Sequence, residues 1–320
     1  MAVALAFDFT NGFHDTANAV ATSVSTRALS PRLAVLIASL ANLAGAFVTT
    51  AVATTVGKGI IETNLATPKT VLAAVIGAIA WNLMTWWLGL PSSSSHALIG
   101  GLIGAALAQS GASGVLWHGV AHKVVIPAIW APTIAFAGGF VLLLAIFWGL
   151  QRLTPGIANR SFRLGQLASG TWMAFTHGAN DAQKTMGVIA LALYIEGEID
   201  HFYIPNWVKL AAGLAIAAGT YFGGWRIIRT VGTGIYQMEP AGGFAAQATA
   251  GMVIYASTRA GYPLSTTHVI SGAVIGSGAT RRLSAVRWGV AGNIVFAWIL
   301  TIPAAAVVAA GVYYVAAAVT

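Results

Sequence analysis

The sequence GLPSSSSH occupies residues 89–96, and GYPLSTTH occupies residues 261–268 with the same order of glycine, proline, hydroxyl side chains and histidine. Both stretches stand between long apolar segments that are otherwise suited to lipid. A second matching pair precedes them, with FTNGFHD at residues 9–15 and FTHGAND at residues 175–181. The repeated order indicates that the chain is a tandem duplication. Polar clusters at membrane depth are typical of transporters.

The composition is that of a membrane protein. Hydrophobic residues make up 57% of the 320 residues and charged residues only 8%, which does not describe a soluble globular domain. Apolar stretches at residues 33–55, 124–150 and 286–319 exceed the roughly 20 residues that a helix needs to cross a bilayer. The 37 glycines suit close helix packing in lipid. We therefore expect an all-α polytopic membrane protein.

Several classes of function are disfavoured by composition. The net charge is +8, but no soluble basic domain is present that could bind nucleic acid. The absence of cysteine excludes disulfides and thiolate metal sites. The first apolar span begins at Met1 and carries Asp8 and Asp15, which does not resemble a cleavable signal peptide. Truncation of the chain at its start stays open as an alternative, because some residues usually precede a membrane-spanning helix.

The duplication predicts the domain organisation. A third matching pair, residues 55–60 and 230–235, supports two membrane repeats at residues 1–155 and 156–320. Each repeat is expected to contain three spanning helices and one re-entrant helical hairpin. The hairpins are placed at about 69–109 and about 240–280, each with two apolar segments that flank a Ser/Thr-rich stretch. An odd number of crossings gives the second repeat the opposite orientation, so the fold expected is a pair of inverted-topology repeats.

The distribution of basic residues predicts the orientation. Ten arginines fall on one side of the membrane in this layout, and four lysines fall on the other with acidic residues beside them. The arginines are Arg27, Arg32, Arg152, Arg160, Arg163, Arg226, Arg229, Arg281, Arg282 and Arg287, and the opposite side carries Lys58, Lys69, Lys123, Lys209, Glu62, Glu196, Glu198 and Asp200. The positive-inside rule places the arginines in the cytoplasm and both termini outside the cell membrane. Two complete spans in place of each re-entrant hairpin would leave every loop on the same side of the membrane. The distribution of basic residues therefore does not show that the hairpins are re-entrant.

The hydroxyl-rich stretches have the chemistry of an anion site. Serine and threonine before a helix are natural N-caps, and helices starting near His96 and His268 would present free N–H groups and the positive end of the dipole. A helix start ringed by hydroxyl donors binds anions readily. The alternative is a pair of capped loops at the membrane surface.

The other repeated motif supplies negative charge. Asp15 and Asp181 lie mid-span, where an unpaired charge is costly, so each needs a partner or a watery cavity. Asn11, Asn18 and Asn180 add amide oxygens of the kind that bind hard cations. Carboxylates beside an anion repel it unless cations or protons lie between them, which favours coupled transport. A purely structural hydrogen-bonding role is the alternative.

Other polar residues near the motifs have less defined roles. Asp8 has no acidic counterpart in the second copy, where Ala174 stands, so a structural role is equally open for it. Four histidines border the motifs and are suited to proton relay, although each could instead cap a helix or bond a carbonyl. They are His14, His96, His177 and His268.

These motifs carry a resemblance to a known family. FDFTNGFHDTANA at residues 7–19 and GANDAQKTMG at residues 178–187 resemble the two signatures of the inorganic phosphate transporter (PiT) family. The SSSSH and STTH stretches are similar to its hairpin motifs. The resemblance implies a symporter that imports phosphate by an elevator-like or related cycle. It implies phosphate binding by Ser93, Ser94, Ser95, Ser265, Thr266 and Thr267, and a coupling cation or proton at Asp15, Asn18, Asn180, Asp181, Lys184 and Asn11.

The chain departs from the sodium-coupled pattern at one position. Asp15 and Asn18 have the spacing Asp-x-x-Asn, whereas the second copy has Asp181 and Lys184. An ammonium would repel or replace a sodium ion. The second copy, with Gln183 and Lys184 after Asp181, resembles that of bacterial proton-coupled, low-affinity members of the family. Some of these members carry phosphate as a neutral complex with a divalent metal. We therefore expect Lys184 to act as a built-in cation, with snorkelling to an interface as the alternative.

The partners expected are inorganic phosphate and the lipid bilayer, with no nucleic acid, resident metal or cofactor, and with a divalent metal open as co-substrate. A homodimer is left open. The alternatives are a sodium-coupled phosphate symporter, a permease for sulfate or another oxyanion, a channel, and an intramembrane hydrolase with a hairpin serine as nucleophile. The duplicated site and the missing Gly-x-Ser-x-Gly elbow speak against the hydrolase. The chain is not expected to be an enzyme.

Overall fold

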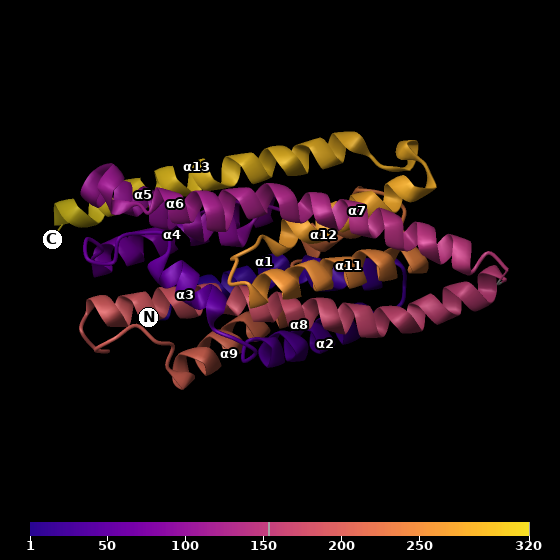
Figure 1. The fold of residues 1–320 in the computed structure, drawn as a ribbon, viewed down its shortest axis with the longest axis horizontal. Coiled ribbons are helices and arrows are strands. Elements are labelled where there is room, and N and C mark those ends of the chain that lie inside the picture. Colours follow the sequence, from indigo (N-terminus) through magenta and orange to yellow (C-terminus); the bar gives the residue numbers. More distant parts are fainter. Residues whose placement is uncertain (153, 320) are drawn as a thin grey trace.

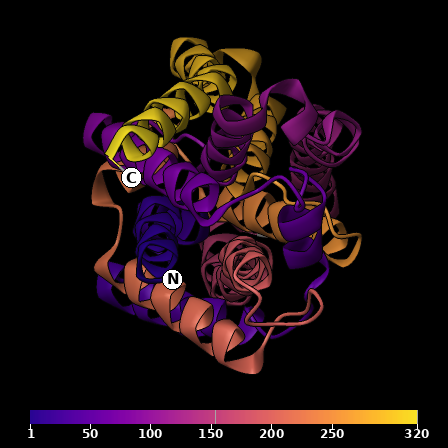
Figure 2. The same ribbon diagram turned by 90° about the vertical axis from the view of Figure 1, so that its left-hand side faces the viewer.

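The helices run mostly along the long axis of the molecule, and both termini lie toward the same end of that axis (Figures 1 and 2). The structure is a computed structural model that describes residues 1–152 and 154–319. Within these residues there is no strand, only an isolated bridge between Ile61 and Val115. The expectation of an all-helical protein is confirmed.

The main helices of the first half of the chain return in the same order in the second half, whereas the π-helical turns fall at different places. The first half contains α1 (Ala2–Ser25), α2 (Pro31–Gly45), α3 (Ala51–Lys58), α4 (Pro68–Leu88), α5 (Ser94–Ser110), α6 (Trp117–Val120), a π-helical turn (Ala121–Val125) and α7 (Ile126–Gly149). The second half contains α8 (Pro155–Ile195), α9 (Asn206–Phe222), α10 (Trp225–Arg229), a π-helical turn (Thr230–Gly234), α11 (Pro240–Arg259), α12 (Thr266–Arg281) and α13 (Trp288–Val319). Four described helical stretches are long and apolar enough to cross a membrane: Pro68–Leu88, Ser94–Gly114, Trp117–Gly149 and Trp288–Val319.

The expected continuous span at residues 33–55 is wrong. The chain leaves the helix after Gly45 and starts α3 at Ala51. The new helix start is stabilised from a distant part of the sequence, because the Gln183 side-chain oxygen on α8 accepts hydrogen bonds from the backbone N–H groups of Val52 (2.9 Å) and Ala53 (3.3 Å). This interaction satisfies N–H groups that a helix start leaves without an intrahelical partner.

Two helical hairpins approach the middle of the molecule from opposite ends (Figure 1). Helices α4 and α5 form one hairpin, and α11 and α12 form the other. Each loop begins with a glycine in the left-handed region, Gly89 (φ 67°) and Gly261 (φ 75°), which glycine adopts without steric cost. The loops meet at their tips, where the His96 and His268 rings lie 4.7 Å apart between centroids.

Each hairpin packs against the long final helix of the other half. Helix α13 lies along α5 and α4, and α7 lies along α12 and α11. Matching glycines allow close contact: a Cβ at Gly104 would lie 2.0 Å from the carbonyl oxygen of Ala306, and one at Gly276 would lie 2.0 Å from that of Phe136. The two halves are therefore interlocked rather than side by side.

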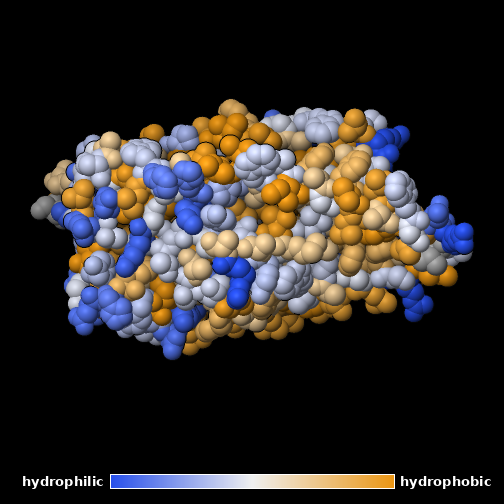
Figure 3. All heavy atoms as spheres, in the orientation of Figure 1, coloured by the Kyte–Doolittle hydropathy of each residue, from blue (hydrophilic) through white to orange (hydrophobic). Residues whose placement is uncertain are grey.

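The outer surface fits a lipid environment. Large side chains of α7 and α13 are exposed, among them Trp130, Ile134, Phe296 and Ile299. Hydrophilic side chains gather toward the two ends of the long axis on the face in view, with hydrophobic ones more frequent between them (Figure 3). This distribution matches that of a protein that spans a bilayer.

Candidate functional site

The repeated motifs converge at mid-length in the bundle. Helices α1 and α8 carry the acidic motifs and pack against each other. The tips of both hairpins meet the same region, so the Ser/Thr-rich stretches and the acidic motifs share one buried site. Asp15 and Asp181 are 2% and 0% exposed. The tertiary structure thus brings four separate stretches of sequence together.

The tip of the second hairpin lies between the two acidic residues. Thr267 donates a hydrogen bond to Asp15 (3.4 Å between oxygens), and Thr266 donates one to Asp181 (3.3 Å). Asn18 donates to both threonine hydroxyls, at 2.9 Å to Thr267 and 3.2 Å to Thr266. The hydroxyls that could bind an anion are therefore in contact with the carboxylates that could bind a cation.

Lys184 joins the two hairpins. Its ammonium forms an ion pair with Asp181 and donates to the Ser95 hydroxyl and to the carbonyl oxygen of Leu264 (2.7 Å). Ser95 donates to the same carbonyl oxygen at 3.1 Å. The side chain is 1% exposed, so the alternative in which Lys184 snorkels to an interface is wrong. A cation is thereby built into the site beside a carboxylate.

The two serines that precede the hairpin helices act as N-caps. The Ser93 hydroxyl accepts from the backbone N–H of His96 (3.0 Å), and the Ser265 hydroxyl accepts from that of His268 (3.2 Å). This contact fixes the start of α5 and of α12. Ser94 lies farther inside, with its oxygen 3.5 Å from Nδ1 of His14. The helix starts therefore point their N-terminal turns at the site.

His14 orients Asp15. Its Nδ1 lies 2.7 Å from the Asp15 carboxylate, and its Nε2 lies 3.1 Å from the hydroxyl of Thr85 on α4. Ser92 in turn donates to Thr85 at 2.8 Å. Sequence reasoning missed Thr85, because an isolated threonine in an apolar helix gives no signal of its own.

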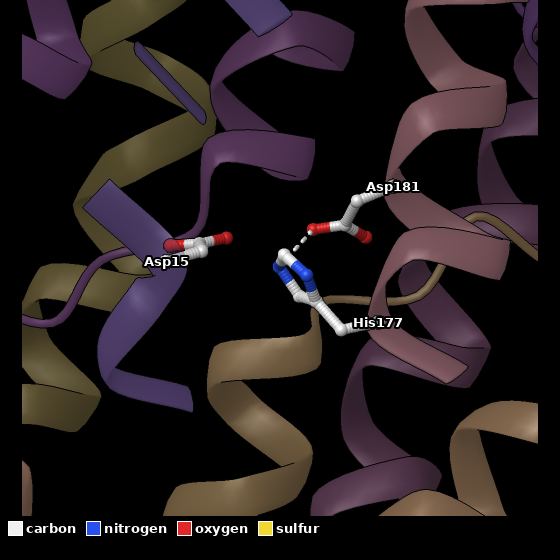
Figure 4. A group of neighbouring side chains, drawn as sticks. All are labelled: Asp15, His177 and Asp181. Carbon is white, nitrogen blue, oxygen red and sulfur yellow. Dashed lines mark ion pairs between the residues drawn. The ribbon is translucent and has the colours of Figure 1, made fainter. Parts of the chain in front are cut away.

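His177 completes a group with the chemistry of a cation site. One ligand atom from each of Asp15, His177 and Asp181 lies within 4.8 Å of the others, and Figure 4 shows the three side chains facing a common space. His177 Nε2 lies 3.2 Å from the Asp181 carboxylate without the geometry of a hydrogen bond. Its Nδ1 is 3.0 Å from the side-chain oxygen of Asn42. The sequence marked His177 only as a neighbour of the motif.

The asparagines divide into two sets. Asn180 donates to Thr258 (2.8 Å) and to the carbonyl oxygen of Tyr262 (3.1 Å), while the side-chain oxygens of Asn18 and Asn180 are buried without a partner. Amide oxygens of this kind are free to bind a cation. Asn11 lies one helical turn before the site and takes part in none of these hydrogen bonds.

The site offers two kinds of ligand chemistry. For an anion it presents neutral hydroxyls, the starts of two helices and one ammonium, which are groups that can bind a tetrahedral oxyanion. For a cation it presents two carboxylates, an imidazole and amide oxygens. Each bound charge lowers the electrostatic cost of the other, since the buried environment screens them weakly.

The comparisons with known proteins agree on one family. The model of the phosphate transporter family matches residues 11–157 and 150–309. A protein of Mycobacterium tuberculosis named "Probable low-affinity inorganic phosphate transporter" is 51% identical over 316 residues, which are 97% of this chain and 75% of that relative. A protein of the same name from Rhizobium meliloti is 49% identical over 318 residues, which are 99% of this chain and 95% of that relative.

A solved structure has the same architecture. It is that of the sodium-dependent phosphate transporter, which is 26% identical in sequence, with a TM-score of 0.88, and the match covers 99% of this chain and 98% of that one. The family resemblance stated from the motifs is confirmed, and so is the expectation that the chain is not an enzyme. With the repeated motifs gathered in one buried site and both halves of the chain matched, this chain belongs to the phosphate transporter family.

Proposed function

We propose that this chain is a secondary active transporter that imports inorganic phosphate across the cell membrane together with protons. The observation that carries the proposal is the position of Lys184. It is buried beside Asp181, at the place in the second copy of the motif where the first copy has Asn18. An ammonium there replaces one metal cation, because it supplies the positive charge that the carboxylate and an incoming phosphate both need.

Phosphate is proposed to bind between the hairpin tips. Ser93, Ser94, Ser95, Ser265, Thr266 and Thr267 supply hydroxyls, and Lys184 supplies the charge. Ser93 and Ser265 hold the helix starts in place through their N-cap hydrogen bonds. In the structure Lys184 pairs with Asp181, so a bound phosphate would share the ammonium with that carboxylate.

The coupling proton is proposed to bind at Asp15 or Asp181. Asn18, Asn180 and His177 border these carboxylates. The group of Asp15, His177 and Asp181 also has ligands for a divalent metal carried as a neutral metal–phosphate complex. In either form the positive charge crosses with the anion, which reduces the cost of moving phosphate through a site of low dielectric.

The fold supports an alternating-access cycle. We propose two inverted-topology repeats, residues 1–155 and 156–320, each with three spanning helices and one re-entrant hairpin. The opposite directions of the hairpins and their packing on the final helix of the other half support this arrangement. Each hairpin would then close one side of the site. We propose that both termini face outward, because the arginines gather at the other side in this layout.

Sodium coupling is the second candidate. The solved relative is a sodium-dependent phosphate transporter with the same fold, and this chain keeps Asp15 and Asn18 in the first copy of the motif. An oxyanion such as sulfate would use the same hydroxyls, so specificity for phosphate also needs a direct test.

Uptake into liposomes tests the proposal. Purified protein is reconstituted, and uptake of radiolabelled phosphate is measured with pH, sodium and magnesium gradients imposed one at a time, with excess unlabelled sulfate in a parallel series. We expect uptake that follows the pH gradient, is indifferent to sodium and resists sulfate. Uptake that follows sodium alone would replace proton coupling by sodium coupling, and the absence of uptake under every gradient would refute transport.

A further inference from the structure

A second buried carboxyl lies on α1 outside the site described above. Asp8 is 0% exposed, and neither oxygen of its carboxyl has a hydrogen-bond partner. In the described part of the chain, no nitrogen of a lysine, arginine or histidine lies within ion-pair distance of it. A buried charge without a partner is strongly destabilising, so this carboxyl needs a proton or a cation that the protein itself does not supply.

The polar side chains around Asp8 are also without partners. Thr185 of α8 and Asn11 of α1 lie close enough to its carboxyl to act on it, although neither meets the geometry of a hydrogen bond to it. Asn82 of α4 is likewise buried with both side-chain polar atoms unpartnered. We call Asp8, Asn11, Asn82 and Thr185 the outer polar cluster.

The register of the helices places Asn82 at the level of the other members. Helices α1 and α4 pack together, and Thr85 of α4 lies 3.1 Å from His14 of α1. Asn82 and Asn11 each lie three residues before these two positions, and α1 and α4 run in the same direction from the end that holds the termini (Figure 1). The four residues thus stand one to two turns from the central site, toward that end.

A cavity of about 560 Å³ lies at that end of the molecule. It is lined by the ends of α1, α4 and α8, and its innermost residues are Ala4, Val75 and Val188. These stand one turn from Asp8, two turns from Asn82 and one turn from Thr185, so the wall of the cavity lies one to two helical turns from the cluster, and most of that wall is apolar. Glu196 and Glu198 also line it and are exposed. Their negative charge favours cations at the mouth.

The cluster exists in one half of the duplicated chain only. The positions that correspond in the repeat to Asp8, Asn11, Asn82 and Thr185 hold Ala174, His177, Ile254 and Ala19. The end of the molecule that holds the arginines therefore has no equivalent carboxyl. A cation site made of these residues would therefore be reached from one side of the transporter only.

We propose that the outer polar cluster binds a small monovalent cation, a proton or a sodium ion, and delivers it to Asp15 and Asp181. Carboxylate, amide and hydroxyl oxygens are the ligands that hard cations prefer. Asp8 lies seven residues before Asp15 on the same helix, about 10 Å along its axis. The charged groups of α8 that act on Asp8 are Asp181, which favours a cation there, and Lys184, which opposes one. The cluster thus connects the acidic mouth to the central site.

The proposal rests on the proposed function and is tested with Asp8→Asn. Two rates are measured in liposomes: uptake driven by a pH or a sodium gradient, and exchange of internal for external phosphate without a gradient. We expect driven uptake to fall by about tenfold, which corresponds to a loss of about 1.4 kcal/mol in cation binding, while exchange stays near the wild-type rate. The gradient whose effect is lost identifies the ion as a proton or as sodium. Asp8→Glu keeps a carboxyl and should keep coupling.

The control is Ser271→Ala, which removes another buried hydroxyl without a partner, on α12; it should change neither rate. Unchanged driven uptake in Asp8→Asn would overturn the proposal, as would an equal loss of both rates in a variant that melts at the wild-type temperature. If Asp8→Asn does not fold, the double variant Glu196→Gln and Glu198→Gln is measured instead, and it must lower driven uptake at low salt. Unchanged driven uptake in this double variant would overturn the proposal that cations pass from the cavity to the outer polar cluster. Wild-type protein that neither takes up nor exchanges phosphate would instead refute the proposed function.

Discussion

Replacing Lys184 with asparagine is expected to change the driving ion of transport. The substitution gives the second copy of the motif the Asp-x-x-Asn spacing that the first copy has at Asp15 and Asn18. In the wild-type structure the ammonium contacts Asp181, Ser95 and the carbonyl oxygen of Leu264. Lys184→Asn removes the buried positive charge and leaves an amide oxygen that can bind a cation in its place.

The magnitude follows from the burial of the ion pair. Both partners are at most 1% exposed, and removal of one partner from a buried pair costs about 3–5 kcal/mol. A hydrogen bond to a charged group contributes about 1.5–3 kcal/mol, so loss of the ammonium that phosphate would contact should lower phosphate affinity by about 10- to 100-fold, since each 1.4 kcal/mol is a factor of about ten. A sodium ion held between Asp181 and the new amide would restore most of this loss.

The assay is the initial rate of phosphate uptake into liposomes with and without sodium. Lys184→Asn should transport slowly under a pH gradient alone and recover when sodium is added. Lys184→Met, which has neither charge nor a cation ligand, should stay slow under both conditions. Lys58→Gln, at an exposed position, is the control for loss of a lysine. Wild-type rates for Lys184→Asn, driven by protons and blind to sodium, would refute the reasoning.

Three further predictions concern the hairpin tips, the packing of the helices and the orientation in the membrane. The double variant His96→Cys and His268→Cys should be joined by a short bifunctional methanethiosulfonate, because the native rings lie 4.7 Å apart in a chain without other cysteines; phosphate binding should be lost on cross-linking and return on reduction, and retained binding in the cross-linked form would contradict a site between the tips. Gly104→Ala should destabilise the protein by about 1–3 kcal/mol, seen as a lower melting temperature, since its Cβ would lie 2.0 Å from a carbonyl oxygen of α13; Gly292→Ala, with no atom nearby, should not. A cysteine introduced at Arg160 should react with an impermeant maleimide only from the cytoplasmic side, and labelling from outside would reverse the proposed orientation.

Part of the site could be predicted because its signals are local. The two serine caps follow from the residues beside them, since Ser93 and Ser265 bond N–H groups only three positions away. The family also follows from short motifs that keep their order in both halves. The continuous span at residues 33–55 was wrong for the opposite reason. The break is stabilised by Gln183, which lies more than a hundred residues farther along the chain, and hydropathy carries no information about such a partner.

The sequence by itself determined that the protein is helical, suited to a membrane and duplicated, because composition and repeated motifs are properties of the chain alone. Only the tertiary structure decided which polar groups meet. It buried Lys184 against Asp181 and a hydroxyl of the first hairpin, and it left Asp8 without a partner. The reason is physical: the energy of a buried charge depends on the groups that surround it, and in this bundle those groups come from helices distant in sequence.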